Sequence, residues 1–322
     1  MGRGGMAKQI LVSGESLVDM IPDSERLNSF QGVPGGSPFN VARALGRLGV
    51  PVVFLGRFSR DRFGDLLCET LRESGVGLDY ARRVDALSTL GFVRPSARGG
   101  GPDYAFYTTG TAGCELAVSD IPQPFPESVR IVHVGSFSLA IDSFSPAIDA
   151  LLAQATQQNR LVAVDLNIRP FLIGEREPFL ARLDDVTRSA DVIKLSDEDL
   201  AWLHPGMSVE RYTEQMLGRG AALVVVTRGK DGVYGATQKV RVNCVAPEVD
   251  VVDTVGAGDT LQAALLGALL EAGWDTGDGV ANLGEAALEQ ALGRAVMAAA
   301  INCQSAGCVP PTRDALDRMM KG

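Results

Sequence analysis

The sequence predicts an α/β protein with a doubly wound, mostly parallel sheet and helices on both faces. Short runs nearly continuous in Val, Ile and Leu alternate with longer amphipathic segments over the first two thirds of the chain. Continuous apolar runs are typical of strands that helices cover on both faces, and this alternation is typical of parallel sheets. The 322 residues, 46% of them hydrophobic, suffice for one large α/β domain or two smaller ones.

The individual elements follow from the spacing of apolar residues. Six short apolar runs are predicted to be strands: Ile10–Ser13, Val52–Leu55, Ile131–Val134, Leu161–Val164, Val192–Leu195 and Leu223–Thr227. Helical spacing predicts the segments between them: Phe39–Leu48, Phe63–Ser74, Ser145–Gln157, Glu177–Arg188 and Val209–Leu217. The last part of the chain is predicted to be helical: Thr260–Ala272, Ala286–Asn302 and Asp314–Met320.

Two stretches interrupt the alternation. The polar residues 19–30 follow the first strand directly, and residues 87–109 contain two β-like runs around a glycine-rich turn. We interpret both as strands of a small sheet that projects from the main one and acts as a lid over a ligand. An ordinary surface hairpin is the alternative.

Composition narrows the class of protein. The formal net charge of -9, from 30 basic and 39 acidic residues, argues against nucleic-acid or anionic-membrane binding, because both need a basic face. Five cysteines, few and odd in number, are typical of reduced thiols in a cytoplasmic protein. No apolar run approaches the ~20 residues that span a bilayer. Residues 1–8 lack the apolar core of a signal peptide and are predicted to be a disordered leader before a domain over 9–322.

A glycine-rich turn opens the first helix of the C-terminal part. In DTVGAGDTLQAALLGALL, residues 253–270, Gly256, Ala257 and Gly258 leave the first N–H groups of the helix uncovered. The helix dipole adds partial positive charge there, so a phosphoryl group can approach the backbone. Asp259 suits a general base that orients a hydroxyl group and takes its proton. The alternative is a tight turn with Asp259 as an ordinary N-terminal acid.

Other nucleotide-binding loops are absent from the sequence, and a second polar cluster lies near its start. No G-x-x-x-x-G-K-[ST] occurs, and no G-x-G-x-x-G follows the first strand, which disfavours Walker and Rossmann proteins. Asp19 and Asn40, with the intervening Gly35 and Gly36, provide the hydrogen-bonding groups and the close approach that polyol recognition requires. A turn capped by Ser37 would explain the same glycines, and both interpretations can hold together.

These two segments resemble a known family. GGSPFNVARALGRLG near the start and DTVGAGDTLQAALLGAL near the end resemble the two signatures of the ribokinase-like (PfkB) carbohydrate kinases, and the resemblance covers nearly the whole chain. It implies that ATP, with Mg²⁺, donates its γ-phosphate to a sugar or nucleoside hydroxyl. It also implies roles for the residues above: Asp259 as catalytic base, Gly256, Ala257 and Gly258 as anion hole, and Asp19, Gly35, Gly36 and Asn40 as sugar ligands.

A central motif adds a cation to this set. The stretch DLNIR, residues 165–169, resembles the D-x-N-x-R stretch of fructokinases and ketodeoxygluconate kinases. The resemblance implies that Asn167 lies at the substrate and that Arg169 neutralises charge near the transferred phosphate. A surface cation beside Pro170 is the alternative for Arg169.

The motif KLSDED, residues 194–199, resembles the N-x-x-E motif that the family links to magnesium, with Ser196 and Asp199 in place of Asn and Glu. It implies that Asp199, or its rival Glu198, acts on Mg²⁺ through water. A capped helix start is the alternative. The resemblance also implies a set of nucleotide-binding residues: Lys194, Ser196, Thr227, Gly229, Gly232, Ala299 and Asn302. It further assigns Asp253 to a monovalent-cation loop, which makes K⁺ a second expected ion.

The sugar is suggested by resemblance alone. GESLVDMIP, VDLNIRP and INCQSAGCVPP resemble segments of bacterial fructokinases, which implies phosphorylation of a primary hydroxyl of a hexose, fructose. Ketodeoxygluconate kinase, ribokinase and nucleoside kinase remain alternatives, and Arg94 and Arg98 in the lid leave a sugar phosphate open. The intact Asp259 and Arg169 disfavour a non-catalytic sugar-binding regulator. We expect sugar and ATP as ligands and a homodimer through the lid, because such apolar strands are poorly stable alone.

Overall fold

The computed structural model describes residues 7–23, 26, 28–94 and 103–321. Nine strands of the described chain form the central sheet: β1 (Gln9–Ser13), β4 (Val52–Ser59), β5 (Gly77–Val84), β8 (Val129–Gly135), β9 (Leu161–Asp165), β10 (Val192–Ser196), β11 (Leu223–Thr227), β12 (Val233–Ala236) and β13 (Arg241–Cys244). Their order is β13-β12-β11-β10-β9-β8-β1-β4-β5. The antiparallel pairs among these strands are β11–β12 and β12–β13. The other pairs are parallel, which confirms the mostly parallel sheet.

All six predicted strands are present, and three further strands lie at the two edges of the sheet. β5 (GLDYARRV) is partly exposed along its length. It carries charged residues in place of a continuous apolar run, because an edge strand does not need to be covered on both faces. β12 and β13 have four residues each, which is too short for a periodic signal.

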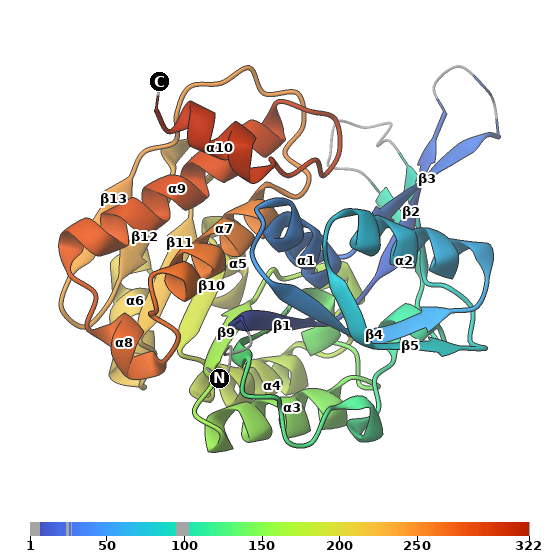
Figure 1. Ribbon diagram of the computed structural model, residues 1–322, viewed down its shortest axis with the longest axis horizontal. Coiled ribbons are helices and arrows are strands. Elements are labelled where there is room, and N and C mark those ends of the chain that lie inside the picture. Colours follow the sequence, from blue (N-terminus) through green and yellow to red (C-terminus); the bar gives the residue numbers. More distant parts are fainter. Residues whose placement is uncertain (1–6, 24–25, 27, 95–102, 322) are drawn as a thin grey trace, which may run out of the picture.

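Helices cover both faces of this sheet (Figure 1). The described α-helices are α1 (Ser37–Arg47), α2 (Arg62–Glu73), α3 (Ser145–Gln157), α4 (Arg176–Arg188), α5 (Asp197–Leu203), α6 (Val209–Gly218), α7 (Ala257–Glu271), α8 (Gly277–Ala281), α9 (Glu285–Cys303) and α10 (Arg313–Met319). Short 3₁₀ helices are η1 (Ala112–Cys114), η2 (Val118–Asp120), η3 (Ser136–Leu139), η4 (Pro170–Leu172) and η5 (Gly229–Asp231). The eight predicted helices are confirmed. The short α8 was not predicted, and α5 was predicted only as the alternative interpretation of residues 194–199. None of the helices in the described chain combines the length and apolar character needed to cross a bilayer.

Two hydrophobic cores form, one on each side of the sheet. Ile10 and Val12 of β1 pack with α1, α2, α7 and α9. Leu11, between them, packs on the opposite face with α3, α4 and α6. Successive side chains of a strand point to opposite faces, so a strand covered twice must be apolar at every position. This explains why continuous Val, Ile and Leu runs identified the strands.

A separate, smaller sheet projects beside the main one (Figure 1). It contains β2 (Leu17–Pro22), β3 (Phe30–Gly35), β6 (Leu90–Arg94) and β7 (Asp103–Tyr107), in the order β3-β2-β6-β7. The predicted small sheet is therefore present. The predicted stretch over residues 19–30 covers most of β2 and the first residue of β3, which are separated by a turn in which Asn28 has a φ of 62°.

Parts of two predictions lie outside the described residues. The predicted glycine-rich turn of the lid falls largely on residues 95–102, which include Arg98, and residues 1–6 contain most of the predicted leader. Lys8 of that leader is described, and its ammonium group pairs with Asp275 at 2.7 Å.

The carboxyl ends of the parallel strands bring the predicted site residues to one edge of the main sheet. β9 ends at Asp165, β10 at Ser196 and β11 at Thr227, and β1 leads through Gly14 into the smaller sheet. Ligands of open α/β sheets bind outside this edge. The fold therefore places the sugar and nucleotide motifs, which lie far apart in the sequence, on one side of the molecule.

Candidate active site

Asp259 lies in the first turn of α7, which begins directly after Gly256. Gly256 has a φ of 76°, in the left-handed region, and a side chain there would collide with Cys308. Only glycine meets both conditions. This turn directs Asp259 inward, where it is 8% exposed. Ser37 Oγ donates to Asp259 Oδ1 (2.7 Å) and Asn40 Nδ2 donates to Oδ2 (2.9 Å), so both residues at the start of α1 hold the carboxylate.

Burial raises the pKa of the Asp259 carboxyl above its ordinary value, because desolvation disfavours the charged form. The hydrogen bonds from Ser37 and Asn40 oppose that shift of the pKa. Asp165 raises the pKa further and Lys194 lowers it. A carboxyl with a raised pKa is a stronger base than a free aspartate, which suits it to accept a proton from an alcohol.

A buried ion pair lies against the start of α7. Lys194 Nζ and Asp165 Oδ2 are 2.6 Å apart, and both side chains are buried. The same Nζ lies 3.1 Å from the position that a Cβ atom on Gly258 would take. The ammonium therefore adds positive charge next to the start of α7, where an anion is expected. The Ala257 N–H there already donates to the Thr254 carbonyl (3.2 Å).

Gly258→Ala should lower kcat at least about tenfold, because the added methyl group would meet the Lys194 ammonium and cover the amides that stabilise developing charge. Steady-state kinetics would test this. Gly293→Ala, in α9 where an added Cβ meets nothing within 4 Å, is the matched control. It should leave kcat unchanged and raise the free energy of unfolding by about 1 kcal/mol. Equal kcat values for the two variants would contradict the role of Gly258.

The predicted sugar residues meet where the smaller sheet joins α1. Asp19 Oδ2 lies 2.5 Å from the Cβ position of Gly35, and Oδ1 lies 2.9 Å from that of Gly91. Both glycines therefore make room for this carboxylate. Burial raises the pKa of Asp19 to about 6. Gly36 has a φ of 105° and passes close to the Glu15 carbonyl, so it provides a tight entry into α1.

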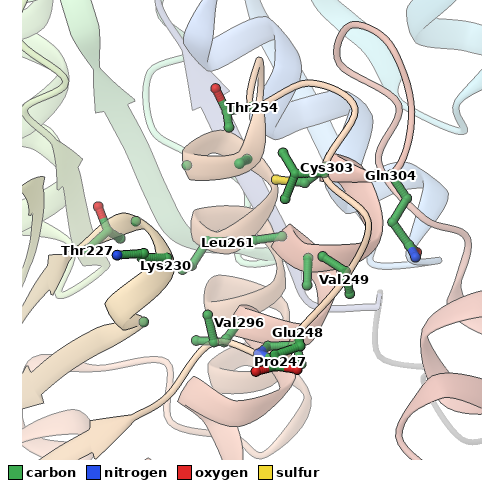
Figure 2. Close-up of a pocket in the computed structure, with 18 of the residues that line it drawn as sticks. Thr227, Lys230, Pro247, Glu248, Val249, Thr254, Leu261, Val296, Cys303 and Gln304 are labelled. Atoms are coloured by element: carbon green, nitrogen blue, oxygen red, sulfur yellow. The ribbon is translucent and has the colours of Figure 1, made fainter.

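A cavity of about 940 Å³ lies on the other side of the α7 turn. Of the predicted residues, those that line it are Ala257, Gly258, Thr227, Gly229, Gly232 and Ala299. Figure 2 shows Thr227 and Lys230 on one side and Val249, Cys303 and Gln304 on the other. The cavity therefore reaches from the start of α7 to α9, so one end of it lies at a helix N-terminus and the other at apolar side chains.

Sequence reasoning missed one wall of this cavity. The residues it missed are Ala246, Pro247, Glu248, Val249, Asp250 and Val251, followed by Thr254, Leu261, Val296, Cys303, Gln304 and Met319. Residues 246–251 form neither helix nor strand and have no periodicity to interpret. The sequence shows two adjacent valines there, Val251 and Val252, and only the structure shows that both are exposed.

Three residues predicted to bind nucleotide do not line the cavity. Asn302 is buried, and its Nδ2 donates to the Val255 carbonyl (2.8 Å). Ser196 caps α5, and Lys194 pairs with Asp165 as described. Their contacts position the walls of the cavity, while direct nucleotide contact by these three residues stays a prediction.

The carboxylates predicted to serve metals accept backbone hydrogen bonds. Asp199 Oδ1 accepts from the Ile168 N–H and Oδ2 from the Ser196 N–H, each at 2.9 Å. Ser196 and Asp199 thus form the capping box that was the alternative interpretation. Glu198, next to them, is exposed. Within the described residues, no group of three or more His, Cys, Asp or Glu side chains is arranged to hold a metal ion.

Two further predicted residues sit in constrained loops. Asn167 has a φ of 36°, which is uncommon for a residue with a side chain. Arg169 Nη1 donates to the Ile168 carbonyl at 3.0 Å. Asp253 accepts from the Val255 N–H (3.0 Å) and the Gly307 N–H (2.8 Å), which ties the segment before α7 to the segment after α9.

The arrangement agrees with a known family. A family model described as pfkB family carbohydrate kinase matches residues 7–315. The chain belongs to this family. Among curated relatives of this pfkB chain, a fructokinase of Rhizobium leguminosarum bv. trifolii is 37% identical over 281 residues, which are 87% of this chain and 85% of the relative.

Solved structures of pfkB relatives share the fold. A fructokinase from Xylella fastidiosa with bound ATP superposes with a TM-score of 0.90 at 27% identity, covering 98% of this chain and 99% of that one. A fructokinase from Vibrio cholerae O395 in a form that binds fructose, ADP and calcium ion has a TM-score of 0.80 at 28% identity, with 96% of each chain covered. The ribokinase-like fold expected from the sequence is confirmed.

Proposed function

We propose that the protein is an ATP-dependent kinase that phosphorylates a primary hydroxyl of a hexose, fructose. The observation that carries this proposal is the position of Asp259 between Asn40 on the sugar side and Gly258 at the edge of the nucleotide cavity. The fructokinases among the relatives support the sugar assignment.

The residues of the chain support a direct transfer. Asp259 accepts the hydrogen of the sugar hydroxyl and takes its proton as the hydroxyl oxygen bonds to the γ-phosphorus of ATP. The bond from that phosphorus to the bridging oxygen breaks at the same time, and ADP leaves. The Gly258 N–H and the nearby Lys194 ammonium stabilise the charge on the transferred group. The Ala257 N–H, which donates to the Thr254 carbonyl in this structure, would add to them once released from that carbonyl. Asp19 and Asn40 hold the other hydroxyls. Arg169 remains our proposal for neutralising charge on the phosphate side, although its Nη1 donates to a neighbouring carbonyl in this structure.

Mg²⁺ is proposed to act beside Glu198 and Asp199 in the acidic first turn of α5, with other ligands completing its shell, because these side chains do not form a metal site by themselves. Because both oxygens of Asp199 already accept N–H groups, this residue would act on the ion through water, whereas the exposed Glu198 is free to approach more closely. Mg²⁺ keeps several waters and ATP phosphates as ligands, and it would neutralise phosphate charge.

K⁺ at the Asp253 loop is also proposed, and replacing potassium by choline in the assay buffer would test it.

The test of the function is ATP turnover with a panel of acceptors: fructose, ribose, ketodeoxygluconate, adenosine and fructose 6-phosphate. We expect the highest kcat/KM with fructose. A higher value for ribose, ketodeoxygluconate or adenosine would replace the sugar assignment but keep the kinase. No turnover with any sugar, together with sugar binding in calorimetry, would favour a regulator.

Cytoplasmic location is proposed as well, supported by the five free cysteines.

The KM for fructose should rise about tenfold from pH 7 to pH 5. Asp19 has a pKa raised to about 6 by burial, so it is ionised at pH 7 and becomes protonated below pH 6, where it loses acceptor capacity for sugar hydroxyls. Asp19→Asn should show a high KM at both pH values. Asp23→Asn, in the exposed turn after β2, should retain the wild-type profile. A wild-type pH dependence in Asp19→Asn would contradict the role of Asp19.

We also propose a homodimer that forms through the smaller sheet. Phe30 is 46% exposed and Tyr107 is 62% exposed, and both rings pack edge-on against Phe92 between them. A row of exposed aromatic rings on a four-stranded sheet is suited to pack against the same sheet of a second copy of the chain. Sedimentation at micromolar concentration should give a dimer, and Phe30→Ser with Tyr107→Ser should give monomers. A monomeric wild type would contradict the proposal.

A further inference from the structure

A second buried carboxylate supports the start of α1. Glu15 is 0% exposed and follows β1 at the entry to the smaller sheet. Its Oε1 accepts from the Ser37 N–H (3.2 Å) and its Oε2 from the Ser138 N–H (3.1 Å). The Ser136 hydroxyl also donates to it. Glu15 therefore joins three segments of the chain at one point, and none of the motifs considered above assigns a role to it.

Ser37 continues this connection to the base. Its N–H donates to Glu15 while its hydroxyl donates to Asp259 Oδ1 at 2.7 Å. Gly36 cannot carry a side chain, because a Cβ atom there would lie 2.7 Å from the Glu15 carbonyl oxygen. The backbone at Ser37 is thus fixed from both sides, and its hydroxyl has a defined direction.

We propose that Ser37 is a positioning residue for the general base Asp259, and that the buried Glu15 fixes Ser37 for this task. This inference rests on the proposed kinase function. Ser37 donates to one carboxylate oxygen and Asn40 to the other, so the carboxylate cannot rotate away from the site. Each oxygen keeps a second lone pair, which is where the hydrogen of the sugar hydroxyl can be accepted.

The Ser37 hydroxyl also keeps Asp259 charged. Desolvation raises the pKa of Asp259, and a donor to the ionised form lowers it. The other groups that act on Asp259 are Asp165 from β9, Lys194 from β10 and Asn40 from α1. The Cys308 thiol after α9 lies near it with its own pKa raised to about 12 and stays neutral. Ser37 and Asn40 are therefore the two side-chain donors that oppose the rise in the pKa of Asp259 caused by burial.

The test compares Ser37→Ala with Ser37→Thr, which keeps the hydroxyl. In Ser37→Ala we expect kcat to fall about tenfold and the acidic limb of the kcat profile at saturating fructose to move to higher pH. Ser37→Thr should restore both. Ser208→Ala, which removes a capping serine at the exposed start of α6, is the matched control and should change neither.

A second measurement does not depend on turnover. The carboxyl titration of Asp259 in the full-length, sugar-free protein can be followed by ¹³C NMR with labelled aspartate, and Asp259→Asn identifies the signal. Its midpoint should be higher in Ser37→Ala than in the wild type. An unchanged midpoint together with an unchanged pH profile would overturn the inference. Absence of sugar phosphorylation by the wild type would instead refute the proposed function, while the titration would still test the contact.

Discussion

Asp259→Asn should lower kcat for fructose by about 10²–10⁴-fold, the usual contribution of a general base. The amide has nearly the same shape and retains an oxygen that can accept from the Ser37 hydroxyl, which donates to Oδ1 in the wild type. It cannot take a proton from the sugar. Steady-state kinetics with fructose and ATP would measure the loss, and calorimetry should find sugar binding that is largely unchanged.

The stability of this variant is a second readout. The raised pKa of Asp259 means that the folded state binds a proton more tightly than the unfolded state, so its charge destabilises the fold as the pH rises above the unfolded value. At pH 7 the neutral Asn should therefore have an equal or higher melting temperature. Asp314→Asn, an exposed acid in the first turn of α10, is the control and should leave kcat intact. Wild-type turnover in Asp259→Asn would contradict the assignment of the base.

Lys194→Ala should reduce the free energy of unfolding by about 3–5 kcal/mol, because it leaves the buried Asp165 charge without its partner. The pair is among the least exposed in the described chain, at 5% and 0% exposure of the two side chains. Urea denaturation followed by circular dichroism would measure the change. Arg188→Ala, which breaks an exposed pair with Asp184, should cost less than about 1 kcal/mol.

The double variant Lys194→Met with Asp165→Asn separates stability from catalysis. With both charges removed and the volume nearly kept, most of the lost stability should return. Turnover should stay low, because the positive charge beside Gly258 is then missing. A double variant as active as the wild type would show that this ammonium has no part in phosphoryl transfer.

The strands of the central sheet were predictable from the sequence where burial on both faces requires an apolar residue at every position. Leu11 and Val12 pack into opposite cores, so the strand between helix layers must be apolar throughout, and its run is readable. β5 was not predicted because it lies at the edge of the sheet, where a strand can carry charged residues. The sequence did not show where β2 ends and β3 begins, because the turn near Asn28 depends on local backbone geometry, which apolar spacing does not encode.

The candidate site was predictable where the backbone requires a particular residue type, as it does at the glycines before α7. Gly256 and Gly258 mark a helix start that must stay uncovered, and the structure lines the cavity with Gly258. The Glu15 connection was not predicted, since a single acid after a strand carries no periodic signal and its burial depends on contacts with Ser37 and Ser138 from distant segments. The same limit applies to residues 246–251.

Ser37 and Asp259 are 222 positions apart in the chain, yet their side chains share a hydrogen bond. Closing so long a loop is among the slow events of folding, and during synthesis the N-terminal half is made long before its counterpart. Enzymatic activity should therefore appear only after the last helices have docked. The recovery of turnover during refolding would then report when the whole chain, and not just its first half, has become native.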